Sequence, residues 1–128
     1  VTAKGSGGMH NGMIAPLQPF AIKGVIWYQG EANSQPGKSQ YYGAQLAMLV
    51  SDWRSRWGQG DFPFAWVQLP NFSSNRPDWL VVRDEMRKTL ALPHTGMAVT
   101  TVPKPTTQEL LTGATATQPL TTVPVAGG

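Results

Sequence analysis

Five consecutive residues, Gln29-Gly30-Glu31-Ala32-Asn33, combine side chains that are suited to acyl transfer. The Gln29 amide offers N–H donors, which stabilise an oxyanion as it develops on a reacting carbonyl. Gly30 permits a tight bend and a close approach of substrate to the backbone. Glu31 is suited to orient a base, pair with an arginine or cap a loop, and Asn33 to bind a substrate hydroxyl or cap a turn. A polar strand-to-helix turn without a catalytic role is the alternative that spacing leaves open.

The segments around this block predict a layered α/β fold. Residues 23–28 are predicted to be a strand, because Val25 to Tyr28 form a continuous apolar run, typical of a strand that is covered on both faces. Apolar spacing then predicts a helix over 41–57, a strand over 62–69, a helix over 77–92 and a strand over 97–102. Strands that alternate with helices favour parallel pairing with right-handed crossovers.

The two predicted helices each have one apolar face, and the segments between elements are expected to be irregular. The side chains expected to face inward are Tyr42, Leu46, Leu49, Trp53, Trp57, Trp79, Val82, Met86 and Leu90. Arg54 is expected on the polar face of the first helix. Residues 1–13 are predicted to be loop, and 14–22 a short turn or helical segment that ends before Pro19.

Polar residues follow the first two predicted strands. Parallel sheets place their ligand sites at the carboxyl ends of the strands. Gln29 to Glu31 come after the first strand and Asn71 after the second, so we expect them at one edge of the sheet. The candidate residues for substrate binding are Asn11, Asn33 and Asn71.

Five stretches of the chain resemble one known family. They are NGMIAPL (11–17), IKGVIWYQGEAN (22–33), DWRSRWGQGDFPF (52–64), VQLPNF (67–72) and ALPHTGMAVT (91–100). Together they are similar to the sialate O-acetylesterase group of SGNH hydrolases, which deacetylate carbohydrates. The resemblance implies a three-layer, flavodoxin-like α/β fold with a parallel sheet and serine acyl transfer without a metal or organic cofactor. It places the oxyanion hole on Gln29 and Gly30, with Glu31 and Asn33 in the same block.

The catalytic blocks at both ends of that family's domain do not occur in this sequence. The family's serine lies in a Gly-Gln-Ser-Asn block and its histidine in an Asp-x-x-His motif after the last strand, whereas residues 102–107 here read VPKPTT. We therefore expect a partial SGNH domain over 1–102, incomplete at both ends, and a Thr/Pro-rich irregular tail over 103–128. Residues 120–125 are a candidate edge strand. The tail fits a truncated or frame-shifted end, which the other two nucleotide reading frames would test.

Substitutes for the two missing groups are few. Ser34 lies beside the block and is a candidate nucleophile, and His10 is a candidate base in a loop over the site. Ser6 is expected in a flexible loop, and His94 at the start of a strand, the wrong end for catalysis. A serine needs an adjacent base, and an oxyanion hole alone gives only residual catalysis. The isolated chain is therefore expected to be a weak or inactive esterase.

Composition narrows the classes of partner. The net charge is +3, but the basic residues are scattered, so nucleic-acid binding is not expected. The chain has no cysteine and no apolar run of membrane-spanning length, so neither thiolate chemistry nor a membrane partner is expected. No signal peptide is visible. The location stays open, although the resemblance implies a family that is often secreted or periplasmic.

Two further hypotheses follow from the same residues. The chain is alternatively a non-catalytic carbohydrate-binding or scaffolding fragment, with Trp27, Tyr28 and Trp66 as stacking faces if they are exposed, although core burial is expected for all three. An incomplete sheet leaves an open edge and an apolar face, which a second copy of the chain would cover. The expected partners are an acetylated carbohydrate or small ester and, through that open sheet, a homo-oligomer.

Overall fold

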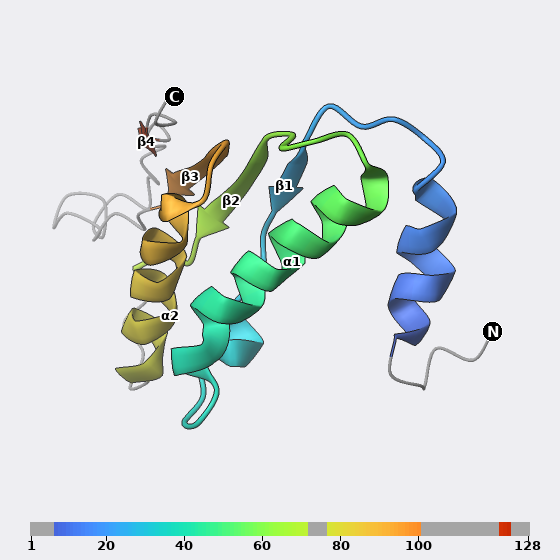
Figure 1. Ribbon diagram of the computed structural model, residues 1–128. Helices are drawn as coiled ribbons and strands as arrows, with labels where there is room; N and C mark the ends of the chain where they lie inside the picture. The colour runs from blue at the N-terminus through green and yellow to red at the C-terminus, as the bar shows by residue number, and fades with distance from the viewer. Residues whose placement is uncertain (1–6, 72–76, 101–120, 124–128) are drawn as a thin grey trace, which may run out of the picture.

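A four-stranded sheet forms the centre of the protein. The computed structural model describes residues 7–71 and 77–100 in full and the backbone of 121–123 (Figure 1). The strand order is β1-β2-β3-β4, in which the first three strands are parallel and β4 pairs antiparallel with β3. The strands are β1 (Val25–Trp27), β2 (Phe64–Gln68), β3 (Thr95–Val99) and β4 (Thr121–Val123). The predicted α/β class with a parallel sheet is confirmed, and β4 lies in the stretch that was a candidate edge strand.

Both long helices cover the same face of the sheet (Figure 1). When strand order follows chain order, right-handed crossovers place successive helices on one face. The helix α1 (Tyr42–Trp57) joins β1 to β2, and α2 (Pro77–Lys88) precedes β3. The shorter helical segments are η1 (His10–Ile14), η2 (Ala15–Leu17), η3 (Glu31–Asn33), η4 (Ser39–Tyr41) and η5 (Thr89–Ala91).

Several elements differ in extent from the sequence expectation. β1 and β2 are shorter than the predicted 23–28 and 62–69, and the last part of the predicted helix 77–92 is the separate 3₁₀ turn η5. The prediction of a loop over 1–13 is wrong for residues 10–13. These residues belong to η1, a π-helix whose backbone hydrogen bonds form despite the glycines nearby. The third strand begins at Thr95, two residues early, because Thr95 and Gly96 pair in register with Phe64 and Ala65 of β2. Residues 101 and 102 of the predicted strand, like Ser6 and most of the predicted tail, lie outside the described residues.

The core lies between the sheet and the two helices. Alternate residues of β2 point toward the helices and are buried. Phe64 and Trp66 among them form one core cluster with Leu46 and Val50 of α1 and Val82 and Met86 of α2. Three expected members of the α1 face are half-buried and pack against the core: Leu49, Trp53 and Trp57. The Trp53 ring stacks on Trp57 and meets Phe64 of β2 edge to face. The expected burial is confirmed for Trp66. It is wrong for Tyr28, which follows the end of β1 and is 60% exposed.

Arg54 is buried, contrary to its expected place on the polar face of α1. Only 9% of it is exposed. Its guanidinium donates hydrogen bonds to the carbonyl oxygens of Phe62 (2.9 Å), Pro93 (2.8 Å) and His94 (3.2 Å), and it lies 3.6 Å from the Asp61 carboxylate. Arg54 therefore ties together the two loops that precede β2 and β3.

We expect Arg54→Met to lower the free energy of unfolding by about 2–3 kcal/mol, because part-buried carbonyls lose their donors. Arg56→Met is the matched control on the same helix. Arg56 forms an exposed i,i+4 ion pair with Asp52, which solvent screens, so its loss is expected to leave the free energy of unfolding nearly unchanged. Urea denaturation measures both changes, and equal losses for the two variants would contradict the bracing role of Arg54.

The opposite face of the sheet is not covered by a helix in the described part of the chain. Ile26 lies on this face and is 83% exposed, with Ala65 and Val67 beside it on β2 and Ala98 on β3, all half-buried. β1 is also an edge strand of the sheet. The described residues therefore provide the sheet and one helical layer. Among them, no helix is both long and apolar enough to span a bilayer.

Candidate active site

The polar block directly follows β1 at the carboxyl edge of the sheet. Gly30 is buried, and its φ of 157° is a conformation that side chains rarely adopt. A Cβ atom at Gly30 would lie 3.0 Å from Met86, 3.3 Å from Val82 and 3.4 Å from Leu69. The bend thus needs glycine for two reasons: its backbone angle and its close packing against α2 and the end of β2.

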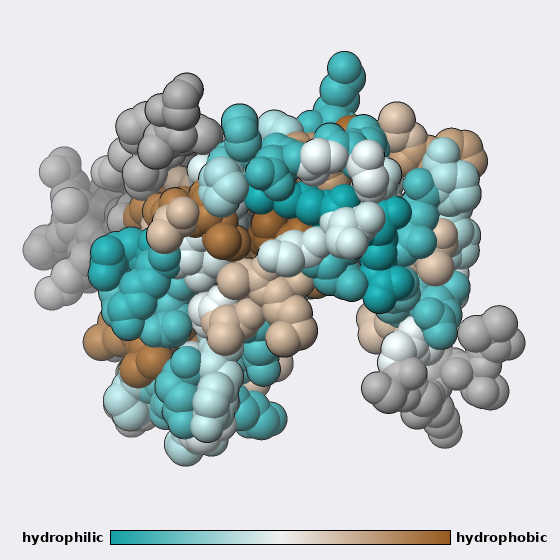
Figure 2. Space-filling view, in the orientation of Figure 1, coloured by the Kyte–Doolittle hydropathy of each residue, from teal (hydrophilic) through white to brown (hydrophobic). Residues whose placement is uncertain are grey.

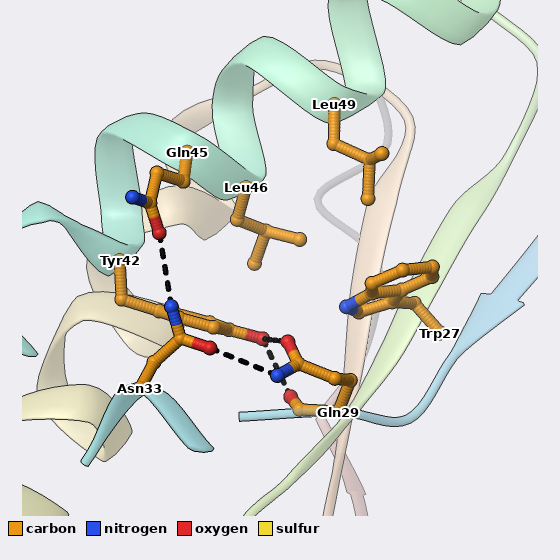
Figure 3. A pocket seen from close by; sticks show the side chains of 7 residues that line it. All are labelled: Trp27, Gln29, Asn33, Tyr42, Gln45, Leu46 and Leu49. Carbon is orange, nitrogen blue, oxygen red and sulfur yellow. Dashed lines mark hydrogen bonds between the residues drawn. The ribbon is translucent and has the colours of Figure 1, made fainter. Parts of the chain in front are cut away.

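A chain of hydrogen bonds from α1 fixes the Gln29 side chain (Figure 3). The Tyr42 hydroxyl donates to the main-chain oxygen of Gln29 at 2.5 Å and lies 3.3 Å from its Oε1. Gln29 Nε2 donates to Asn33 Oδ1 (2.8 Å), and Asn33 Nδ2 donates to Gln45 Oε1 (3.1 Å). An amide nitrogen carries two hydrogens. The second hydrogen of Gln29 Nε2 therefore stays available for a ligand, as far as the described residues go.

The Tyr42 phenol stays protonated and can act as the donor in this chain. Burial raises the pKa of Tyr42 above its usual value, a hydrogen bond with Trp27 lowers it, and the negative charge of Glu31 raises it further. The net rise keeps the hydroxyl hydrogen in place at neutral pH. The orientation of Gln29 is therefore not expected to change with pH in the physiological range.

Glu31 closes its own turn. Its Oε2 accepts a hydrogen bond from the Gly30 N–H at 3.1 Å. This backbone N–H of the block therefore already has a hydrogen-bond partner. The Ser34 hydroxyl donates to the Glu31 main-chain oxygen at 2.6 Å, and Ser34 is only 1% exposed. A nucleophilic role for Ser34 stays a prediction, and it would require this buried hydroxyl to leave its partner.

A small pocket opens between the block and α1 (Figure 3). Its volume is 190 Å³. Side chains from β1, the block and the first two turns of α1 converge on it, and the amides of the hydrogen-bond chain form one of its walls. The lining residues are Trp27, Gln29, Asn33, Tyr42, Gln45, Leu46 and Leu49.

Of the other candidate residues, Asn71 shares the carboxyl edge of the sheet with the block, whereas His10, Asn11 and His94 lie elsewhere. His10 and Asn11 are on η1, where His10 Nδ1 lies 3.3 Å from Asn11 Oδ1, and open space separates this segment from α1 in Figures 1 and 2. His94 precedes β3 at the amino edge of the sheet, as expected. Asn71 follows β2 at the carboxyl edge and is exposed. The structure thus brings Gln29 and Asn33 together, and the roles of His10, Asn11 and Asn71 stay predictions.

The match to a family of known proteins covers most of the chain. The model of the family described as "Carbohydrate esterase, sialic acid-specific acetylesterase" matches residues 6–119. The chain belongs to this family. The resemblance stated from the five sequence stretches is thereby confirmed.

Individual members of this esterase family match shorter parts of the chain. Sialate O-acetylesterase of Mus musculus is 42% identical over 48% of this chain, and that of Homo sapiens is 37% identical over 52%. A solved carbohydrate acetylesterase from Xanthomonas citri is 47% identical over 68% of this chain, with a TM-score of 0.66. The chain spans only 13% and 14% of the two curated relatives and 21% of the solved chain.

Sequence reasoning missed two residues of this candidate site, Tyr42 and Gln45. Tyr42 was assigned to the apolar face of α1 and Gln45 to its polar face, whereas both reach across to the block after β1. Their three-residue spacing puts them on neighbouring positions of one helix surface, which is the signal that was available. Within the described residues, no group of three or more His, Asp or Glu side chains could hold a metal ion.

Proposed function

We propose that this chain forms the acyl-oxygen-binding segment of a carbohydrate acetylesterase that works by serine acyl transfer. The observation that supports it best is the Gln29 amide, fixed by Tyr42 and Asn33 at the carboxyl edge of a parallel sheet. Membership of the carbohydrate esterase family supports the reaction class. The substrate is then an acetylated carbohydrate or a short-chain acyl ester.

In this proposal the two donors of the block act differently. Gln29 Nε2 has a hydrogen to spare and is preorganised, which is what stabilises a developing oxyanion without reorganisation at the moment of reaction. The Gly30 N–H already donates to Glu31, so it reaches an oxyanion only when that carboxylate moves away. Gln29 is therefore the principal donor and Gly30 an auxiliary one, while Glu31 and Asn33 shape the site.

The isolated 128-residue chain is expected to release 4-nitrophenol from 4-nitrophenyl acetate weakly or not at all above the rate in buffer. The reason is that positioned donors cannot replace an activated nucleophile. Turnover that disappears in Ser34→Ala or Ser6→Ala, but survives in Ser51→Ala, would contradict this expectation. It would assign the nucleophile to this chain. If the chain binds sugar but supports no ester hydrolysis, even when the missing parts of the domain are supplied by a relative, the result would instead favour a non-catalytic carbohydrate-binding or scaffolding fragment.

The uncovered sheet face supports a homo-oligomer as the partner of the isolated chain. Ile26 is almost fully exposed on the edge strand β1, and an exposed apolar edge is a surface on which two copies pair. We expect the chain to elute as a dimer or larger species in size-exclusion chromatography with light scattering. Ile26→Lys is expected to convert it to monomer.

The matched control for this change is Met48→Lys. Met48 is also exposed, at 70%, but lies on α1 on the other side of the sheet. A monomeric wild-type chain, or equal effects of the two lysine variants, would contradict pairing through the β1 edge.

A further inference from the structure

Tyr42 and Gln45 reach the block after β1 from one surface of α1 (Figure 3). Tyr42 is 3% exposed and belongs to the hydrophobic core, so packing fixes the place of its hydroxyl group. Gln45 is exposed and lies outside that core. The hydrogen bond of Gln45 to the block can therefore be removed without disturbing the core.

The two residues hold Gln29 from opposite sides. The Tyr42 hydroxyl donates to the main-chain oxygen of Gln29 at 2.5 Å and lies 3.3 Å from its Oε1. On the other side, Gln45 Oε1 accepts from Asn33 Nδ2 at 3.1 Å. The Asn33 oxygen is thereby directed at Gln29 Nε2, at 2.8 Å. Gln29 is thus held at its main chain, its amide oxygen and its amide nitrogen.

The direction of the Gln29 amide decides what the block offers to an acyl oxygen. With one Nε2 hydrogen on Asn33 Oδ1, the second Nε2 hydrogen is the group that an oxyanion would meet. An amide turned end for end would place its oxygen there, where its lone pairs would repel the developing negative charge. That reversal requires Asn33 to turn as well, so that its nitrogen donates to the Gln29 oxygen. Gln45 opposes the turn, because its Oε1 accepts from the nitrogen of Asn33.

We infer that Tyr42 and Gln45 are positioning residues for the Gln29 oxyanion donor. Tyr42 fixes the main chain at the bend, and Gln45 acts through Asn33 to keep the nitrogen of the Gln29 amide, rather than its oxygen, toward the acyl group. The inference rests on the proposed function and adds two residues of α1 to it. Because the donor acts on charge that develops in the transition state, the loss of its support is expected in kcat rather than in KM.

The kinetic test uses an assembly of the domain in which a relative supplies the missing parts, with 4-nitrophenyl acetate as substrate. Tyr42→Phe and Gln45→Met each remove one hydrogen bond and nearly keep the shape of the side chain. We expect each to lower kcat about three- to tenfold, the range that one hydrogen bond of ordinary strength covers, with KM nearly unchanged. Gln45→Glu keeps an acceptor for Asn33 and is expected to recover most of the kcat that Gln45→Met loses.

Matched controls make the same chemical changes just before α1. Tyr41→Phe and Gln40→Met alter exposed side chains that do not line the pocket. Both are expected to leave kcat within about twofold of the parent. Thermal melting of all the variants separates a positioning effect from a loss of folded protein. Equal losses in Gln45→Met and Gln45→Glu, or in Tyr42→Phe and Tyr41→Phe, would overturn the inference.

Double variants show whether the two residues act through Gln29. Once Gln29→Ala has removed the donor, Tyr42→Phe and Gln45→Met are expected to lower kcat no further, because residues that act as a unit are not additive. Losses that add to that of Gln29→Ala would overturn the inference.

NMR of the full 128-residue chain reports the direction of the amide without turnover. A scalar coupling through the hydrogen bond from Gln29 Nε2 to Asn33 Cγ is expected in the wild type and in Gln45→Glu, and it is expected to weaken in Gln45→Met. Coupling in the reverse sense, from Asn33 Nδ2 to Gln29 Cδ, would overturn the inference.

The two readouts separate the inference from the proposed function. If Gln29→Ala loses kcat while Tyr42→Phe and Gln45→Met keep it, the positioning roles fail and the proposed function stands. If Gln29→Ala itself keeps kcat, the proposed function fails, and the NMR coupling still shows whether Gln45 directs the amide.

Discussion

Gln29→Ala is expected to lower kcat for acetate release by about 10²- to 10³-fold in an active assembly of the domain, the loss typical of removing one oxyanion donor. The assembly we suggest is a chimera in which this chain's matching segment replaces its counterpart in the Xanthomonas citri carbohydrate acetylesterase. The 47% identity and TM-score of 0.66 favour a folded product. KM is expected to change little, because the donor acts mainly on the charge that develops in the transition state.

Gln35→Ala is the matched control for this loss. Gln35 lies six residues after Gln29 and is exposed, and its side chain contacts Lys38; only its backbone N–H, which alanine keeps, bonds to the block, at the Asn33 main-chain oxygen. It is expected to leave kcat within about twofold of the parent chimera. Circular dichroism and thermal melting of both variants separate a catalytic loss from misfolding. A Gln29→Ala chimera that is folded and retains kcat within threefold of the parent would contradict the donor role.

Gly30→Ala is expected to lower the free energy of unfolding by about 2–4 kcal/mol. Part of the loss comes from forcing alanine to a φ of 157°, about 1–3 kcal/mol. The remainder comes from the added methyl group, which would lie 3.0 Å from Met86 and close to Val82 and Leu69 in a packed core. Urea denaturation of the isolated chain measures the sum.

Gly37→Ala separates the two contributions. Gly37 also has a positive φ, 78°, but nothing lies within 4 Å of the position its Cβ would take. It is therefore expected to cost about 1 kcal/mol from backbone strain alone. Similar losses for the two variants would show that Gly30 is not held against α2, and that the bend after β1 is less constrained than described.

The sequence predicted the elements of this fold well because apolar spacing reports on burial directly. The faces of α1 and α2 and the parallel order of three strands all follow from such spacing. Arg54 was misplaced because a charged residue on a helix is ordinarily exposed, and nothing in the spacing reveals carbonyl oxygens from two distant loops.

The candidate site was predicted in its position but not in its contacts. Because the polar block follows the first predicted strand in the sequence, Gln29 and Gly30 were expected at the carboxyl edge of the sheet. The structure has them there. The hydrogen bond from Tyr42 to Gln29 and the one from the Gly30 N–H to Glu31 depend on the path of the loop after β1. Such long-range geometry leaves no periodic trace in the sequence. Family resemblance supplied the oxyanion role, which stays a proposal.

The central claim is that the bend after β1 presents the Gln29 amide to the acyl oxygen of the substrate. Its most direct test is a crystal structure of the active chimera with a phosphonate analogue of the tetrahedral intermediate bound. We predict that Gln29 Nε2 lies about 2.7–3.1 Å from the phosphonyl oxygen that takes the oxyanion position. An oxyanion held by other donors, with Gln29 Nε2 more than about 4 Å away from it, would contradict the claim.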